Sequence, residues 1–149
     1  MKKELEIDLK QALKNEEDLK IDEPLANWTT WRVGGCADYL VFPRSIDEIV
    51  NVINIALSYD LPVVTLGNGS NVLVLDKGIK GLVINTKRLC LVEVKDTKLY
   101  AQAGISMTQL ATLAAKHSLT GLEFSAGIPA SLGGAILMNA GAWGRSLGE

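Results

Sequence analysis

Residues 62–75 read PVVTLGNGSNVLVL and place a short polar turn between two apolar runs. A strand is predicted over residues 62–66, and a second apolar run follows over residues 72–75. The turn between them consists of Gly67, Asn68, Gly69, Ser70 and Asn71. Glycine adopts positive φ without strain, and Asn and Ser tolerate the left-handed conformation. Such a turn can point several backbone N–H groups at one spot and hold an anion such as phosphate. The alternative is an ordinary hairpin loop between two buried strands.

The composition is that of a globular protein with one domain's worth of residues. The chain has 149 residues, of which 48% are hydrophobic and 21% are charged. Its net charge of −2, without a basic cluster, argues against nucleic-acid binding. Cys36 and Cys90 lack the spacing of a zinc site, and we expect free thiols in a reducing compartment. The start, MKKELEIDLKQ, has no apolar core of a signal peptide, so we expect a cytoplasmic protein.

The N-terminal residues 1–23 are dense in charge, with Leu5, Leu9 and Leu13 spaced four apart. This spacing predicts an amphipathic helix that lies on the domain, and a solvated tail is the alternative. Pro24 is expected to end this segment, because proline removes a backbone donor and restricts the preceding residue. Residues 27–35 are predicted to form a strand that runs into a tight turn at a glycine pair.

A strand–helix–strand unit is predicted around the opening stretch. Residues 39–42 read as a strand, and Ser45 with Glu48 fits a capping box at the start of a helix. The apolar residues of that helix at helical spacing are Ile46, Ile49, Val50, Ile53, Ala56 and Leu57. With the strand over residues 62–66, this order implies parallel strands. The 67–71 turn would then lie at the carboxyl end of its strand, where open α/β layers place ligands.

The pattern changes to short strands after Gly78 and Gly81. Strands are predicted over residues 82–84, 90–94 and 99–103, with a hairpin turn at residues 95–98. Ser106 and Gln109 predict a capped helix whose inward residues are Met107, Leu110, Ala111 and Ala114. His117, the one histidine, is expected to end that helix. A parallel part followed by a strand-rich part indicates an α+β fold with two subdomains.

A second glycine-rich segment spans residues 121–144, and residues 124–144 contain no charge. Its glycine content argues against a membrane-spanning helix. Pro129 suits a first helical turn, and Ser131 offers a hydroxyl near the same end. A helix that starts here is expected to present N–H groups and its positive dipole end to an anion. Gly133 and Gly134 would allow a phosphate or ring to approach the backbone, and close packing of small residues is the alternative.

Three motifs carry a resemblance to a known family. They are TTWRVGGCAD at residues 29–38, LGNGSNVLV at residues 66–74, and GLEFSAGIPASLGGA with MNAGAWG at residues 121–144. In order and spacing they resemble the UDP-N-acetylenolpyruvoylglucosamine reductase family, also called UDP-N-acetylmuramate dehydrogenases. The resemblance implies an α+β FAD-binding domain of the vanillyl-alcohol-oxidase (PCMH) type over residues 24–149. Such a domain has a small α/β subdomain and a strand-rich one, with FAD between them.

The resemblance also implies the residues that hold non-covalent FAD. The 67–71 turn would bind the pyrophosphate, residues 127–134 would line the dinucleotide, and residues 139–144 would approach the flavin or substrate. The implied cofactor-binding residues are Leu66, Gly67, Asn68, Gly69, Ser70, Asn71, Gly127, Ile128, Pro129, Ser131, Gly133, Gly134, Asn139, Gly141 and Ala142. Ala130 and Trp143 depart from the glycine and tyrosine that many relatives carry there, and Trp143 lacks the phenol hydroxyl.

The family's reaction is the NADPH-dependent, FAD-mediated reduction of UDP-N-acetylglucosamine enolpyruvate in peptidoglycan synthesis. Its Tyr-Arg pair, catalytic serine and carboxylate lie further along than Glu149, so no catalytic residue is assigned in this chain. We therefore expect an N-terminal portion that supplies FAD binding to a UDP-sugar reductase and is inactive alone. No metal, nucleic-acid or membrane partner is expected. The alternatives are another FAD oxidoreductase of the same superfamily and a non-catalytic nucleotide-binding module.

Overall fold

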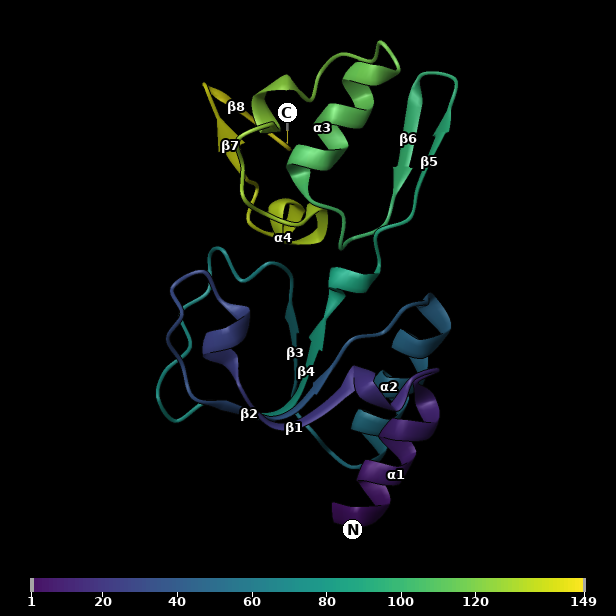
Figure 1. Cartoon of the computed structure of the whole chain (residues 1–149), viewed down its shortest axis with the longest axis vertical. Coiled ribbons are helices and arrows are strands. Elements are labelled where there is room, and N and C mark those ends of the chain that lie inside the picture. The colour runs from purple at the N-terminus through teal and green to yellow at the C-terminus, as the bar shows by residue number, and fades with distance from the viewer. Residues whose placement is uncertain (1, 149) are drawn as a thin grey trace. The chain divides into compact units, whose positions relative to one another are not determined.

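A computed structural model describes residues 2–148 (Figure 1). The chain divides into two compact units, with the boundary between Arg88 and Leu89. Each unit has its own secondary structure and is described by itself. The predicted strand over residues 82–84, which the sequence assigned to a strand-rich part, belongs to the first unit.

The first unit is built on a four-stranded sheet in the order β1-β2-β4-β3. The strands are β1 (Leu19–Pro24), β2 (Cys36–Val41), β3 (Val63–Leu66) and β4 (Ile79–Asn85). Strand β1 runs antiparallel to β2, whereas β2, β4 and β3 are mutually parallel. The predicted parallel arrangement is confirmed, but β4 lies between the two strands that the helix connects. The carboxyl ends of β3 and β4 therefore lie next to each other at one edge of the sheet.

Alternating side chains of the sheet pack into two hydrophobic clusters, because successive residues of a strand point to opposite faces. The helices α1 (Lys2–Ala12) and α2 (Ile46–Ser58) cover one face. The first cluster contains Leu5, Leu9, Leu13, Leu19, Tyr39, Val41, Val52, Ala56, Leu82 and Ile84. The second cluster contains Leu25, Ala37, Leu40, Phe42, Leu66, Val74 and Val83. Trp28, from the short helix η2 (Leu25–Trp28), packs against the second cluster.

The N-terminal segment holds more structure than the sequence indicated. Helix α1 confirms the predicted amphipathic helix, and the three leucines at its spacing are all buried, so the alternative of a solvated tail is wrong. The short helix η1 (Glu16–Asp18) and β1 follow, and the sequence predicted neither. Pro24 is the last residue of β1, a place that proline tolerates because β1 is an edge strand.

Two predicted strands of the first unit are wrong. Residues 27–35 form the end of η2 and a turn, and residues 72–75 form an irregular segment. The 67–71 turn is therefore no hairpin loop between two strands. Val74 alone of residues 72–75 is buried, and the backbone of this segment is tied by the N–H of Gly35, which donates to Leu75 O at 3.0 Å.

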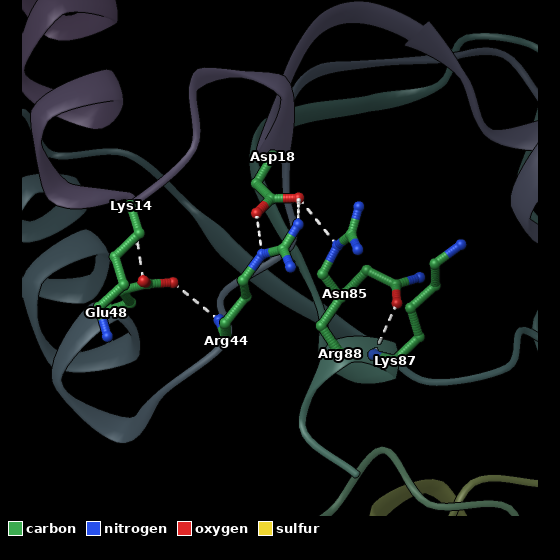
Figure 2. Close-up of polar contacts among 7 residues, drawn as sticks. All are labelled: Lys14, Asp18, Arg44, Glu48, Asn85, Lys87 and Arg88. Atoms are coloured by element: carbon green, nitrogen blue, oxygen red, sulfur yellow. Dashed lines mark hydrogen bonds and ion pairs between the residues drawn. The ribbon is translucent and has the colours of Figure 1, made fainter.

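Helix α2 begins as predicted but buries a different face. The Ser45 hydroxyl accepts a hydrogen bond from the Glu48 N–H at 3.2 Å. The buried residues are Glu48, Val52 and Ala56, whereas the predicted inward residues Ile46, Val50 and Leu57 are exposed. The Glu48 carboxylate accepts the N–H groups of Arg44 at 2.7 Å and Lys14 at 3.3 Å (Figure 2). These bonds compensate the burial of a charged residue in the first turn of α2, while Val52 and Ala56 pack in the first cluster.

The second unit combines two small hairpins with two helices. Strands β5 (Val92–Lys95) and β6 (Lys98–Ala101) form the predicted hairpin, and α3 (Met107–Lys116) buries all four predicted residues. The uncharged residues 124–144 contribute to the short helix η4 (Glu123–Ser125), α4 (Leu132–Leu137) and β7 (Gly141–Ala142), which pairs with β8 (Arg145–Ser146). Within residues 2–148, no helix has the length and apolar character needed to cross a bilayer. The short helix η3 (Thr86–Arg88) ends the first unit.

Candidate functional site

The 67–71 turn follows β3 at the carboxyl edge of the sheet. Leu66 ends β3 and is buried in the second cluster. The carbonyl oxygens of the turn bond to the chain itself, because Gly67 O accepts from the Asn85 amide at 3.3 Å and Gly69 O accepts from the Thr30 N–H at 3.1 Å. The turn is thereby fixed from two sides, by the end of β4 and by the segment after η2.

The N–H groups of the turn behave differently from its carbonyls. Within the part of the chain that the structure describes, the N–H groups of Asn68, Gly69, Ser70 and Asn71 donate to no other group of the protein. Backbone N–H groups that lack a partner are the donors from which anion sites are built. The predicted anion-binding character of the turn is consistent with this geometry.

A side chain at position 69 would collide with neighbouring backbone, so the fold itself requires Gly69. It is buried with φ +66°, and a Cβ atom would lie 2.2 Å from Trp28 O and 2.9 Å from the Thr29 Cα. The group that approaches this glycine most closely is therefore the protein's own backbone.

A pocket of about 480 Å³ lies beside the turn. Gly67 and Asn68 contribute to its wall from the turn, and Asn85 and Lys87 contribute from the end of β4. The remaining wall comes from residues 27–30 and Arg32. The sequence pointed to the turn but missed this wall. The carboxyl-end rule that singled out β3 applies equally to β4, but the sequence did not place β4 beside β3.

The predicted residues of the second segment belong to the second unit. Gly127, Ile128 and Pro129 lie in the loop before α4; Gly127 and Pro129 are exposed, and Ile128 is half-buried. The loop is held by α3, because the Thr108 hydroxyl donates to Ala126 O at 2.8 Å and the Met107 N–H donates to Ala130 O at 3.0 Å. A Cβ atom on Gly127 would have no neighbour within 4 Å.

Helix α4 begins at Leu132, after the predicted start at Pro129, and Ser131 is its N-cap residue. Its first N–H groups all have partners in the second unit. Leu132 donates to Ile105 O at 2.8 Å, Gly133 donates to Ala103 O at 2.8 Å, and Gly134 donates to the Ser131 hydroxyl at 3.4 Å. The prediction that this helix start presents unpaired N–H groups to an anion is therefore wrong. A Cβ atom on Gly133 would lie 2.8 Å from the Ala103 Cβ, so close packing explains this glycine.

The last predicted residues surround the β7–β8 hairpin. Asn139 has φ +45°, and its side-chain oxygen accepts from the Gly148 N–H at 2.8 Å. Gly141 lies in β7, where a Cβ atom would be 2.5 Å from Arg145 O, and Ala142 is half-buried beside it. Trp143 and Gly144 form the turn with φ +58° and +76°. Positive φ at both turn residues is the pattern of a tight hairpin, although an aromatic residue there is unusual.

Candidate catalytic groups are few. His117 follows α3 as its C-cap residue, as predicted. Glu123 accepts the N–H of Gly121 at 2.9 Å. Hydrogen bonds from backbone N–H groups lower the pKa of Glu123, which makes its carboxyl a poor proton donor. Among residues 2–148, no group of three or more His, Cys, Asp and Glu side chains could hold a metal ion.

Comparisons with known proteins agree on the family of this fold. The FAD-binding domain family matches residues 37–148. The chain is 46% identical over 139 residues to the UDP-N-acetylenolpyruvoylglucosamine reductase of Caldanaerobacter subterraneus subsp. tengcongensis, which covers 93% of this chain and 46% of that protein. The crystal structure of UDP-N-acetylenolpyruvylglucosamine reductase from Thermus caldophilus matches with a TM-score of 0.68 and 35% identity, over 86% of this chain and 45% of that one.

A more distant structure shares the fold. An alkyldihydroxyacetonephosphate synthase matches with a TM-score of 0.73 at 22% identity, and the match covers 94% of this chain and 30% of that one. These matches confirm the predicted fold class, the α+β FAD-binding fold. The chain spans a little under half the length of the reductases that it matches.

Proposed function

Because the chain belongs to the FAD-binding domain family, we propose that it holds FAD non-covalently as the cofactor-binding part of a UDP-N-acetylenolpyruvoylglucosamine reductase. The observation that carries the proposal is the 67–71 turn. The N–H groups of residues 68–71 donate to no other group within residues 2–148, and the carbonyls of Gly67 and Gly69 accept from Asn85 and Thr30. A turn whose carbonyls are held in this way suits the diphosphate of a dinucleotide, because its N–H groups are available as donors.

In the second glycine-rich segment, fewer residues contact the cofactor in this proposal than the sequence predicted. Gly127, Ile128 and Pro129 remain candidates for contact with the cofactor through their loop. Ser131, Gly133 and Gly134 act by holding α4 in place, since their polar backbone groups and the hydroxyl are used inside the unit. Asn139, Gly141 and Ala142 position the hairpin whose tip is Trp143.

The reaction that we propose for the whole protein is the NADPH-dependent reduction of UDP-N-acetylglucosamine enolpyruvate to UDP-N-acetylmuramate in peptidoglycan synthesis. The hydride chemistry is supplied by the flavin, and the protein contributes binding and orientation. The chain's similarity to reductases of that name supports this substrate. The proposed compartment is the cytoplasm, in keeping with the free thiol of Cys36.

The direct test is reconstitution of the purified chain with FAD. We expect one FAD per chain after removal of excess cofactor by desalting, measured from the flavin absorbance. Acid precipitation should release the flavin into the supernatant, because binding is non-covalent. His117→Ala is the control, since His117 is the C-cap residue of α3 and is not one of the implied cofactor-binding residues, and it should retain FAD like the parent. A chain that leaves the column without flavin, or a yellow acid pellet, would contradict the proposal.

A further inference from the structure

The charged side chains that line the pocket beside the 67–71 turn are all positive. Its charged lining residues are Arg32 and Lys87, and no carboxylate among the described residues contributes to its wall. The rest of the wall is amide, hydroxyl, backbone and the Trp28 ring. Two cations beside a turn rich in N–H donors would attract an anionic group.

Lys87 lines this pocket, and its ammonium contacts two aromatic rings. Its ammonium lies 4.2 Å from the centroid of the Trp28 ring and 5.4 Å from that of Phe42. Burial lowers the pKa of Lys87, and the neighbouring charges of Arg88 and Lys20 lower it further. A phosphate beside the ammonium would favour its charged form, as the two rings do.

Hydrogen bonds hold the backbone of Lys87, as they hold that of the turn. The Lys87 N–H donates to the Asn85 side-chain oxygen at 3.0 Å, and the same amide donates to Gly67 O. On the other side, Arg88 Nε lies 2.8 Å from a carboxylate oxygen of Asp18, whose other oxygen lies 2.6 Å from Arg44 Nε. Asp18 is fully buried, and Figure 2 shows its carboxylate between the two arginines. One amide therefore couples the position of Lys87 to that of the turn.

Arg32 stands in an unusual backbone conformation. Its φ of +53° lies in the left-handed region, which residues other than Gly, Asn and Asp rarely occupy. The conformation is kept by the Arg32 N–H, which donates to Thr29 O at 3.2 Å, and by the Thr29 hydroxyl, which donates to Val33 O at 3.2 Å. Thr30 joins this loop to Gly69. Backbone strain of this kind occurs preferentially at binding sites.

From these contacts we propose that Arg32 and Lys87 bind the phosphate groups of the ligand at the 67–71 turn and make the pocket selective for diphosphate-bearing ligands over phosphate-free flavin. The inference rests on the proposed FAD binding and deepens it. Lys87 supplies a charge fixed by Asn85, Trp28 and the Asp18 network, and Arg32 supplies a second charge from the facing loop. Neither residue takes part in a chemical step.

The test measures the affinity of the whole chain for FAD, ADP and riboflavin by calorimetry. Lys87→Met and Arg32→Met should each weaken FAD and ADP binding by about tenfold, because each removes one charge-assisted hydrogen bond. Riboflavin binding should not change. Lys87→Arg, which keeps the charge, should retain most of the FAD affinity. Lys3→Met on the exposed side of α1 is the control for loss of a lysine, and it should bind all three ligands like the parent.

The dependence on ionic strength separates a direct role from a structural one. FAD affinity of the parent should fall as salt is added, and the slope should be smaller in Lys87→Met. Unchanged FAD and ADP affinities in both methionine variants would overturn the inference, and so would a parallel loss of riboflavin affinity. If the parent binds ADP but not FAD, the proposed function fails while the ADP arm still decides the inference. If the parent binds no ADP, the inference fails.

Discussion

At the scale of single residues, Gly69 is needed for the stability of the fold as well as for a ligand turn, because the backbone of Trp28 and Thr29 packs against it. Gly69→Ala would force a Cβ atom against Trp28 O, in a backbone conformation that carries a penalty of about 1 kcal/mol or more for other residues. We expect a loss of at least about 1 kcal/mol in the free energy of unfolding without FAD, and a fall of a few degrees in the melting temperature. Thermal unfolding followed by circular dichroism measures this loss. Gly127→Ala is the matched control, because its Cβ atom would meet nothing within 4 Å, and its stability should stay within about 0.5 kcal/mol of the parent. Equal melting temperatures for the two variants would contradict the contact with Trp28.

The sequence predicted which residues form the turn, but it could not predict what approaches them. A glycine flanked by Asn and Ser indicates positive φ, and Gly69 has it. The partner at Gly69 comes from a segment about 40 residues earlier, which the sequence assigned to a strand. Lys87 and Arg32 were missed for the same reason, since neither belongs to a sequence pattern that indicates a ligand site until the fold places it beside the turn.

At the scale of elements, the two helices of the second unit begin at one shared point. Ser106 and Ser131 are the N-cap residues of α3 and α4, and they form an antiparallel bridge with each other. Each hydroxyl accepts one N–H of its own helix, at 3.1 Å from Gln109 and 3.4 Å from Gly134. We expect Ser106→Ala and Ser131→Ala each to lower the free energy of unfolding by about 1 kcal/mol. The double variant should deviate from additivity by about 0.5 kcal/mol or more, because the two caps share the bridge. Ser58→Ala, which removes an exposed hydroxyl bonded to Ile55 O, is the control and should change stability little. Strictly additive losses in urea unfolding would show that the caps are independent.

Capping residues and apolar spacing predicted where helices form. They predicted which face of a helix is buried only where no polar residue takes a place in the core. Helix α3 buries the four predicted apolar residues. Helix α2 buries Glu48 instead of Ile46, because two backbone N–H groups from outside the helix satisfy the carboxylate. Strand β1 was missed because its charged residues and Pro24 resemble a tail, and only pairing with β2 makes them a strand.

At the scale of the whole molecule, the chain should bind the cofactor without performing the reaction. Loaded with FAD, residues 1–149 should show no oxidation of NADPH that depends on the enolpyruvyl substrate. A general acid must lie within hydrogen-bond reach of the reacting atom, and neither His117 nor Glu123 is suited to that role. His117 caps α3, and the backbone bonds to Glu123 keep its carboxyl ionised. NADPH absorbance with and without substrate measures the rate, and a relative of full length is the positive control. Substrate-dependent turnover by residues 1–149 would place a catalytic acid in this chain.

The fold class was predictable because three motifs keep their order and spacing, and the family match and the solved structures confirm it. The position of β4 inside the sheet was not predictable, since strand order depends on long-range pairing. The domain boundary expected at residue 24 stays a prediction.

The position of Trp28 in the pocket wall allows its fluorescence to report on ligand binding. The indole lies 4.6 Å from the Phe42 ring, donates to Glu23 at 2.9 Å, and forms part of the pocket wall. The other two tryptophans are exposed, Trp31 at 68% and Trp143 at 92%, so their emission reports on solvent. Replacing both by phenylalanine leaves Trp28 as the one tryptophan, and its emission overlaps the absorption of flavins. Quenching of that single residue by energy transfer would then follow occupancy in real time, without a label or an enzymatic readout.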